Sequence, residues 1–445
     1  MNKKYYKNAL EVAWPSVLES FFVVLAGIID TYMVSSLGKE AVAAVGLTNQ
    51  PKFIAFSFFM SINVAVSALV ARRKGEDDKK GANTVLVTAL TMAAILFVIV
   101  MSVFVSYSRT ILIWAGSKSD TIDMANTYLR IILGFSFFNI FSMIINAAQR
   151  GSGNTQIAFI SNLISSIVNI FFNYLLIGGN LGFPALGVKG AAIATIIGTV
   201  MAFILSLRSL YKEASFVSLP FIKNKKIKPK AKEFKVITSL GSNMLAENMA
   251  MRTGFMATAW VAAQLGTDEF AAYNVGMQIL SIGFAFADGM QIAAVSLSGQ
   301  SLGSGNKEEA KLYGHVCQRI GMAISFVLSI ILFTLGKDMF KIFFKEAHII
   351  EYGVWITKMI ALIVILQISQ IIYGGCLRAG GDVKYTLMAG IVSVSIIRTA
   401  ATFIFVYLFH WKLFGIWAAV MLDQFCRLLF MSIRFKQGKW VNIKI

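Results

Sequence analysis

Residues 9–36 read ALEVAWPSVLESFFVVLAGIIDTYMVSS, an apolar run interrupted by one proline and few charges. A helix that crosses a bilayer needs about 20 mostly apolar residues, because the hydrocarbon core is about 30 Å thick. The run is long enough for this. It lacks the small-residue cleavage site of a signal peptide, so it predicts a retained first membrane-spanning helix.

The composition of the whole chain agrees with a membrane protein. Of the 445 residues, 57% are hydrophobic and 14% are charged, whereas soluble domains carry about 25% charged residues. Runs of spanning length predict an all-α membrane protein with twelve transmembrane helices. The expected spans are 9–36, 41–70, 84–106, 126–147, 157–178, 188–208, 235–264, 269–301, 316–336, 353–376, 385–409 and 413–433.

The charge distribution predicts an orientation. The 41 Lys and Arg residues exceed the 22 Asp and Glu residues, giving a formal net charge of +19. The basic residues gather in alternate loops, most densely between 208 and 235. Because short loops rich in Lys and Arg stay in the cytoplasm, we expect a multi-pass protein of the cytoplasmic membrane with both termini cytoplasmic. A nucleic-acid partner is not expected, because no basic module with interleaved aromatic residues is present.

The two halves of the chain repeat each other. GKEAVAAVGLTNQ at 38–50 recurs as GTDEFAAYNVGMQ at 266–278, and QRGSGN at 149–154 recurs as LRAGGD at 377–382. Both repeats share an offset of 228 residues, since 266 follows 38 and 378 follows 150 by that number. An even number of spans in each copy predicts parallel lobes related by a pseudo-two-fold axis along the membrane normal. The expected parts are an N-terminal six-helix lobe at 1–210, a basic cytosolic linker at 211–233 and a C-terminal six-helix lobe at 234–445.

Polar side chains inside the spans are candidates for transport chemistry. An ionisable group costs about 3 kcal/mol in the bilayer on insertion scales, so it normally faces a cavity or a partner. Asp30 lies in the first span, after Pro15, which can bend the helix. Asn169 and Asn173 share one helix face, where their carbonyl oxygens can join a carboxylate around a small cation, and Thr195 can add a hydroxyl. The alternative is that Asp30 is a solvated helix-end residue and that the asparagines join helices by hydrogen bonds.

The second half offers further candidates. Glu247 follows Glu19 by the repeat offset, so the repeat predicts two carboxylates at matching depth. Asp288 and Gln278 share a later span and are expected to face a substrate cavity. These residues predict either substrate contact or a second coupling site.

Several arginines have simpler interpretations. Asp423 and Arg427 are four residues apart, the spacing of an ion pair within one helix, with Arg398 as a possible third member. Arg150 and Arg378 are repeat equivalents at helix ends, where long side chains snorkel or cap carbonyl groups.

The ordered motifs resemble the multidrug and toxic compound extrusion (MATE) transporters. They are WPSVLE and DTYMVSSLG in the first span, the QRGSGNT turn, NxxxN in the fifth span, GVKGAAIAT opening the sixth, and their C-terminal echoes. The resemblance implies a secondary antiporter that exports organic, cationic amphiphilic compounds from the cytoplasm in exchange for H⁺ or Na⁺ by alternating access. It assigns the cation or proton site to Asp30, Asn169, Asn173 and Thr195, with Na⁺ as a possible ligand of the first three.

The sequence departs from the family at two of these positions. Some relatives have a carboxylate where this chain has Asn173, so tight Na⁺ binding is weakened and protonation of Asp30 stays open. In some members a carboxylate matching Glu247 pairs with a tenth-helix Asp, but Gln367 occupies that place here. Glu247 is therefore expected to bind cationic substrate, to couple the second lobe or to pair with Arg252.

Enzymatic chemistry and direct ATP use are not predicted. His315, His348 and His410 are far apart and belong to no HExxH motif, and no GxxxxGK[ST] P-loop is present. We expect no cofactor, a monomer, and small organic molecules and membrane lipid as partners. A rival function is a flippase for lipid-linked cell-envelope precursors, which calls for several cationic cavity residues, whereas the intramembrane charges here are mainly acidic.

Overall fold

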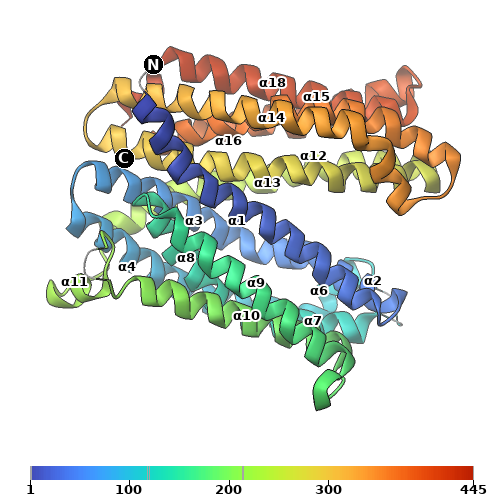
Figure 1. Ribbon diagram of the computed structural model, residues 1–445, viewed down its shortest axis with the longest axis horizontal. Helices are drawn as coiled ribbons and strands as arrows, with labels where there is room; N and C mark the ends of the chain where they lie inside the picture. The colour runs from blue at the N-terminus through green and yellow to red at the C-terminus, as the bar shows by residue number, and fades with distance from the viewer. Residues whose placement is uncertain (1–2, 118, 120, 213–214, 444–445) are drawn as a thin grey trace. The chain divides into compact units, whose positions relative to one another are not determined.

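The computed structural model describes residues 3–117, 119, 121–212 and 215–443, and all regular structure within these ranges is helical (Figure 1). The prediction of an all-α chain is thus confirmed for the described residues. The chain divides into two compact units. We call Leu18–Gly241 the N-lobe, and Met1–Val17 together with Ser242–Ile445 the C-lobe.

The N-lobe contains most of the first helix and the helices up to the start of α12. Helix α9 packs against α10, α8 packs against both α3 and α10, and α7 packs against α10. The elements are α1 (Lys3–Ser35), α2 (Lys39–Leu47), α3 (Asn49–Gly75), α4 (Lys79–Leu96), η1 (Phe97–Met101), α5 (Ser102–Ser106), α6 (Ser108–Trp114), α7 (Ile122–Gly134), α8 (Phe137–Gly151), α9 (Thr155–Gly178), η2 (Asn180–Gly182), α10 (Gly187–Ser209) and α11 (Leu219–Asn224).

The C-lobe is built around α15, which packs against α13, α14 and α18. Two of its segments, η3 and η4, are π-helical, which means that each fits extra residues into the helix relative to an α-helical path. The elements are α12 (Ala231–Leu265), α13 (Thr267–Gly303), α14 (Lys307–Phe343), α15 (Ala347–Ala379), α16 (Val383–Gly390), η3 (Ile391–Arg398), α17 (Thr399–Phe403), η4 (Ile404–Leu408), α18 (Lys412–Gln437) and η5 (Lys439–Asn442).

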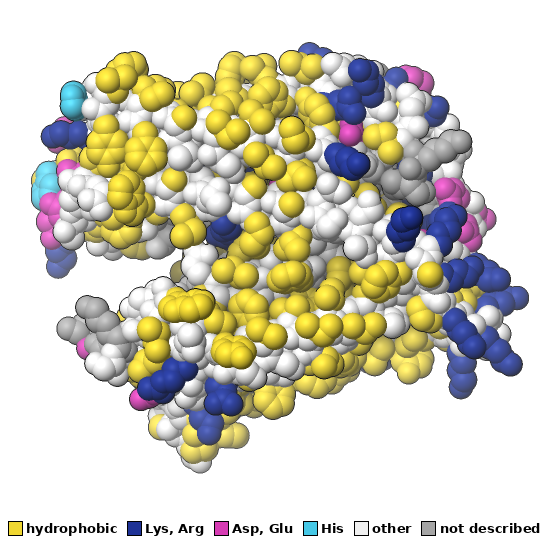
Figure 2. All heavy atoms as spheres, turned by 180° about the vertical axis from the view of Figure 1, so that it is seen from behind, with side chains coloured by type: hydrophobic (Ala, Val, Ile, Leu, Met, Phe, Trp, Pro, Cys, Tyr) yellow, Lys and Arg dark blue, Asp and Glu magenta, His cyan; other side chains and the backbone are white. Residues whose placement is uncertain are grey.

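The expected spans coincide with the long helices. Among the described residues, 10 helices are long and apolar enough to cross a membrane, and 11 if α7 and α8, which meet at 47°, form one broken span. Helix α12 coincides with the remaining expected span, although it carries the charged Glu247 and Arg252. Hydrophobic side chains spread over the face seen in Figure 2, as a lipid-facing surface requires.

The turn after α8 repeats after α15. Gly153 and Gly381, separated by the repeat offset, both have a positive φ, of 93° and 86°, which glycine adopts without strain. At the end of α8, a Cβ on Gly151 would lie 2.5 Å from the carbonyl oxygen of Ser67. Glycine therefore permits the close α3–α8 contact that positions the neighbouring Arg150.

Candidate cation and substrate site

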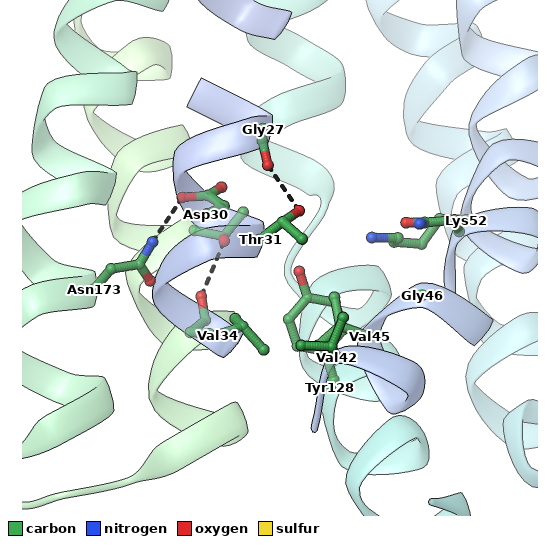
Figure 3. Close-up of a pocket in the computed structure, with 13 residues that line it drawn as sticks. Gly27, Asp30, Thr31, Val34, Val42, Val45, Gly46, Lys52, Tyr128 and Asn173 are labelled. Atoms are coloured by element: carbon green, nitrogen blue, oxygen red, sulfur yellow. Dashed lines mark hydrogen bonds between the residues drawn. The ribbon is translucent and has the colours of Figure 1, made fainter. Parts of the chain in front are cut away.

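A pocket opens within the N-lobe between α1, α2, α3, α7, α9 and α10 (Figure 3). Its cavity volume is about 240 Å³, below the range of about 300–1,000 Å³ typical of small-molecule sites. Most of the lining is small or apolar. The lining residues are Gly27, Asp30, Thr31, Val34, Val42, Val45, Gly46, Asn49, Lys52, Tyr128, Asn173, Ala191 and Thr195.

Asp30 accepts hydrogen bonds from the asparagines of α9. The Asn173 Nδ2 donates to Asp30 Oδ1 at 2.7 Å (Figure 3). The hydrogen-bonding pattern orients the Asn169 amide so that its nitrogen donates to Asp30 Oδ1 at 2.7 Å, while its oxygen accepts from the Thr195 backbone N–H at 3.1 Å. The structure therefore brings together the four residues predicted for the coupling site.

One acceptor of this group is free within the described structure. The buried Asn173 Oδ1 has no hydrogen-bond partner among the described residues. A buried carbonyl oxygen beside a carboxylate is a suitable ligand for a small cation. The geometry is thus compatible with H⁺ or Na⁺ at Asp30, and the roles of these residues stay predictions.

Lys52, near the start of α3, is a pocket residue that the sequence reasoning missed. Its ammonium lies 5.1 Å from the centre of the Tyr128 ring, a distance at which the ring face attracts a cation. The only sequence signal was a lysine inside the expected span 41–70. That lysine lies just after Thr48, where α2 ends and α3 begins.

A second polar group of the N-lobe holds Glu19. Arg150 Nη1 donates to Glu19 Oε1 at 2.9 Å, and Asn162 Nδ2 donates to the same oxygen at 2.7 Å. Arg150 also donates to Asn63 Oδ1 at 3.3 Å. Both charged side chains are buried, so the prediction that Arg150 snorkels or caps a helix end was wrong. A buried guanidinium needs a carboxylate, and α1 supplies one.

The C-lobe reproduces this group at the repeat-equivalent positions. Arg378 Nη2 donates to Glu247 Oε1 at 2.8 Å, and Arg378 Nη1 donates to Gln291 Oε1 at 2.6 Å. Gln291 follows Asn63 by 228 residues, as Arg378 follows Arg150. Arg378, like Arg150, was therefore wrongly predicted to snorkel or cap.

The C-lobe group also contains a second arginine. Arg427 Nη2 donates to Glu247 Oε1 at 3.0 Å, and Thr386 Oγ1 donates to Oε2 at 3.1 Å. The prediction of an Asp423–Arg427 pair within α18 was wrong, because Glu247 takes this guanidinium instead. Glu247 also pairs across helices, with these two arginines, rather than with its neighbour Arg252.

Asp423 pairs with Arg398, the third member that the sequence suggested. Arg398 Nη1 lies 3.8 Å from Asp423 Oδ2, with both side chains at most 1% exposed. Arg398 Nη2 also donates to Thr258 Oγ1 at 3.5 Å. In the repeat, Thr258 is equivalent to Asp30 and Asp423 is equivalent to Thr195.

The remaining second-lobe candidates lie apart. Gln278 and Asp288 are both exposed on α13, about 15 Å apart along the helix axis. Gln367 of α15 is fully buried, and neither polar atom of its amide has a hydrogen-bond partner among the described residues. Pro15 lies within α1, next to the boundary between the lobes at Val17.

A two-lobed bundle of membrane-length helices with a carboxylate-centred pocket defines a membrane transporter. The MatE family model matches the chain twice, over residues 15–175 and 244–404. The chain therefore belongs to the MatE family, and the fold predicted from the sequence is confirmed.

Relatives and solved structures match over nearly the full length. The chain is 26% identical over 440 residues to the probable multidrug resistance protein NorM of Thermotoga maritima, covering 98% of this chain and 93% of that protein. It is 24% identical to the uncharacterized transporter YisQ of Bacillus subtilis, covering 98% and 95%. An outward-facing multidrug resistance MATE family transporter matches with a TM-score of 0.90 at 22% identity, covering 98% and 97%.

Proposed function

We propose that the chain is a secondary antiporter that exports amphiphilic organic compounds from the cytoplasm in exchange for H⁺ or Na⁺. The observation that carries this proposal is the Asp30 carboxylate in the wall of the N-lobe pocket, where it accepts hydrogen bonds from the α9 amides. The names of several relatives, probable multidrug resistance proteins, support the substrate class.

Competition at Asp30 couples the two fluxes. The ionised carboxylate attracts the cationic group of an organic compound, whereas H⁺ or Na⁺ at the same carboxylate removes that attraction. A ligand shifts a conformational equilibrium by its difference in affinity for the two states. Exchange follows when the pocket opens alternately to the two sides of the membrane. Pro15 serves as a bend in α1 during this change, because it removes one helical hydrogen bond.

We place the coupling ion in the N-lobe only. In the C-lobe the equivalent positions hold Thr258 and Asp423, and the Arg398 guanidinium provides a permanent cation there. Glu247 is the counter-ion of two arginines. Exposed Asp288 and Gln278 are assigned to passing substrate, and both termini to the cytoplasm.

The experiment is transport in proteoliposomes with an imposed H⁺ or Na⁺ gradient. Wild type accumulates a cationic dye against its gradient, and Asp30→Asn abolishes this accumulation. The matched control is Asp123→Asn, which removes an exposed carboxylate of the same lobe that pairs with Arg109 at 2.8 Å. Wild-type accumulation by Asp30→Asn contradicts the proposal.

A further inference from the structure

The N-lobe pocket carries charges of both signs. Asp30 and Lys52 are the two charged side chains among its lining residues. Figure 3 shows them on opposite sides, with the Lys52 ammonium directed into the intervening space. With Asp30 ionised, the formal charge of the lining is therefore zero. An ammonium in the wall repels a cationic ligand, so Lys52 does not fit a pocket that binds cations alone.

Lys52 forms no ion pair with a carboxylate among the described residues. Within the described ranges, no carboxylate oxygen lies within the 4.0 Å ion-pair distance of its ammonium. This differs from Arg150 and Arg398, which both have carboxylate partners. The Tyr128 ring holds the ammonium from one face, and an ammonium has three N–H donors. Donors are therefore left for a ligand.

We propose that Lys52 makes this pocket selective for amphiphiles that carry a carboxylate as well as a cationic group. The cationic group lies at Asp30 and the carboxylate at Lys52, so each ligand charge faces its opposite. A compound with only a positive charge meets repulsion from Lys52. The inference rests on the proposed exchange at Asp30 and adds the substrate class.

The same arrangement is compatible with antiport. Proton uptake by Asp30 changes the formal charge of the lining from zero to one positive charge. The cationic end of the zwitterion then loses its partner, while the carboxylate keeps Lys52. Binding weakens without being abolished, so the compound is released at the side where protons are taken up.

Two dyes separate the contributions of the two charges. Rhodamine B carries a cationic ring system and a free carboxylate, and its ethyl ester keeps the cation but lacks the carboxylate. Binding of each dye to the purified protein in detergent is measured by fluorescence anisotropy. We expect Lys52→Met to weaken rhodamine B binding about tenfold relative to the ester, the size of one lost charged hydrogen bond.

Two variants control this experiment. Lys52→Arg keeps the charge and is expected to retain the preference for rhodamine B. Lys189→Met removes an exposed lysine of α10 that is not among the lining residues, and it is expected to leave the ratio of the two affinities unchanged. An unchanged ratio in Lys52→Met, or equal weakening of both dyes, overturns the inference.

Transport assays distinguish this inference from the proposed function. If Asp30→Asn loses transport of both dyes while Lys52→Met leaves their affinity ratio unchanged, the antiport proposal stands and the role of Lys52 is refuted. If wild type moves neither dye against a gradient, the antiport proposal fails for these probes. The anisotropy ratio then still decides whether Lys52 recognises the carboxylate.

Discussion

Replacing Glu247 by Gln is expected to destabilise the C-lobe strongly. The carboxylate, 2% exposed, accepts from Arg378 at 2.8 Å, from Arg427 at 3.0 Å and from Thr386 at 3.1 Å. A glutamine offers one acceptor oxygen and no charge, so two buried guanidiniums lose their counter-ion. Breaking a buried ion pair from one side costs about 3–5 kcal/mol.

This free energy translates into a measurable shift. With about 2.1 cal/mol/K of unfolding entropy per residue, a loss of about 4 kcal/mol lowers the Tm by about 4 °C for a chain of 445 residues. The assay is thermal unfolding of the purified protein in detergent, followed by circular dichroism. The shift is larger if the C-lobe unfolds on its own, because fewer residues then contribute to the entropy.

Two further variants test the cause of the shift. The double variant Glu247→Gln/Arg427→Met removes one of the stranded cations and is expected to recover part of the lost Tm. Glu19→Gln is expected to cost less, because Glu19 pairs with a single arginine that keeps its contact with Asn63. Unfolding of Glu247→Gln at the wild-type temperature refutes this reasoning, and transport lost at full stability indicates a coupling role.

Two other predictions concern the N-lobe. Gly151→Ala places a methyl group against the Ser67 carbonyl oxygen and is expected to lower the free energy of unfolding by about 1–3 kcal/mol. The control in the same unfolding assay is Gly134→Ala, because a Cβ there meets nothing within 4 Å. Equal Tm values for the two variants contradict the close-packing argument. Asn173→Asp adds a second carboxylate beside Asp30 and is expected to lower the Na⁺ concentration for half-maximal exchange several-fold. An unchanged Na⁺ dependence of transport in proteoliposomes counts against a cation site between these two residues.

The spans could be predicted because a bilayer imposes a minimum apolar length on every crossing helix. The expected span 157–178 and the observed α9, Thr155–Gly178, differ by two residues at one end. Hydropathy did not predict which lobe the first residues of the chain pack with. Met1–Val17 belongs with the C-terminal unit, and hydropathy along a helix carries no information about its tertiary partners.

The candidate site was predictable in part for a similar reason. A carboxylate in a membrane span is rare, which singles out Asp30, and the four-residue spacing of Asn169 and Asn173 places both amides on one helix face. Each of these two features can be recognised within a single helix of the sequence. The partner of Arg427 was not predictable, because the spacing of a helical ion pair with Asp423 was satisfied in the sequence. The contact between Arg427 and Glu247 joins residues 180 positions apart in the sequence, and it determines which carboxylate pairs with the Arg427 guanidinium.

The repeat offers a physical reason for our proposal that only the N-lobe has an exchangeable cation site. Asp30 and Thr195 correspond to Thr258 and Asp423, so the carboxylate has moved from the first helix of the repeat to the sixth. The repeat counterpart of Asn169 is Ile397, and Arg398 is the next residue. Arg398 is also the last residue of η3, a π-helical segment that accommodates an extra residue. In the N-lobe the carboxylate faces amides and a pocket, whereas in the C-lobe it faces a covalently attached cation. An attached guanidinium cannot leave, so we assign the proposed exchange of a cation in each transport cycle to the N-lobe position.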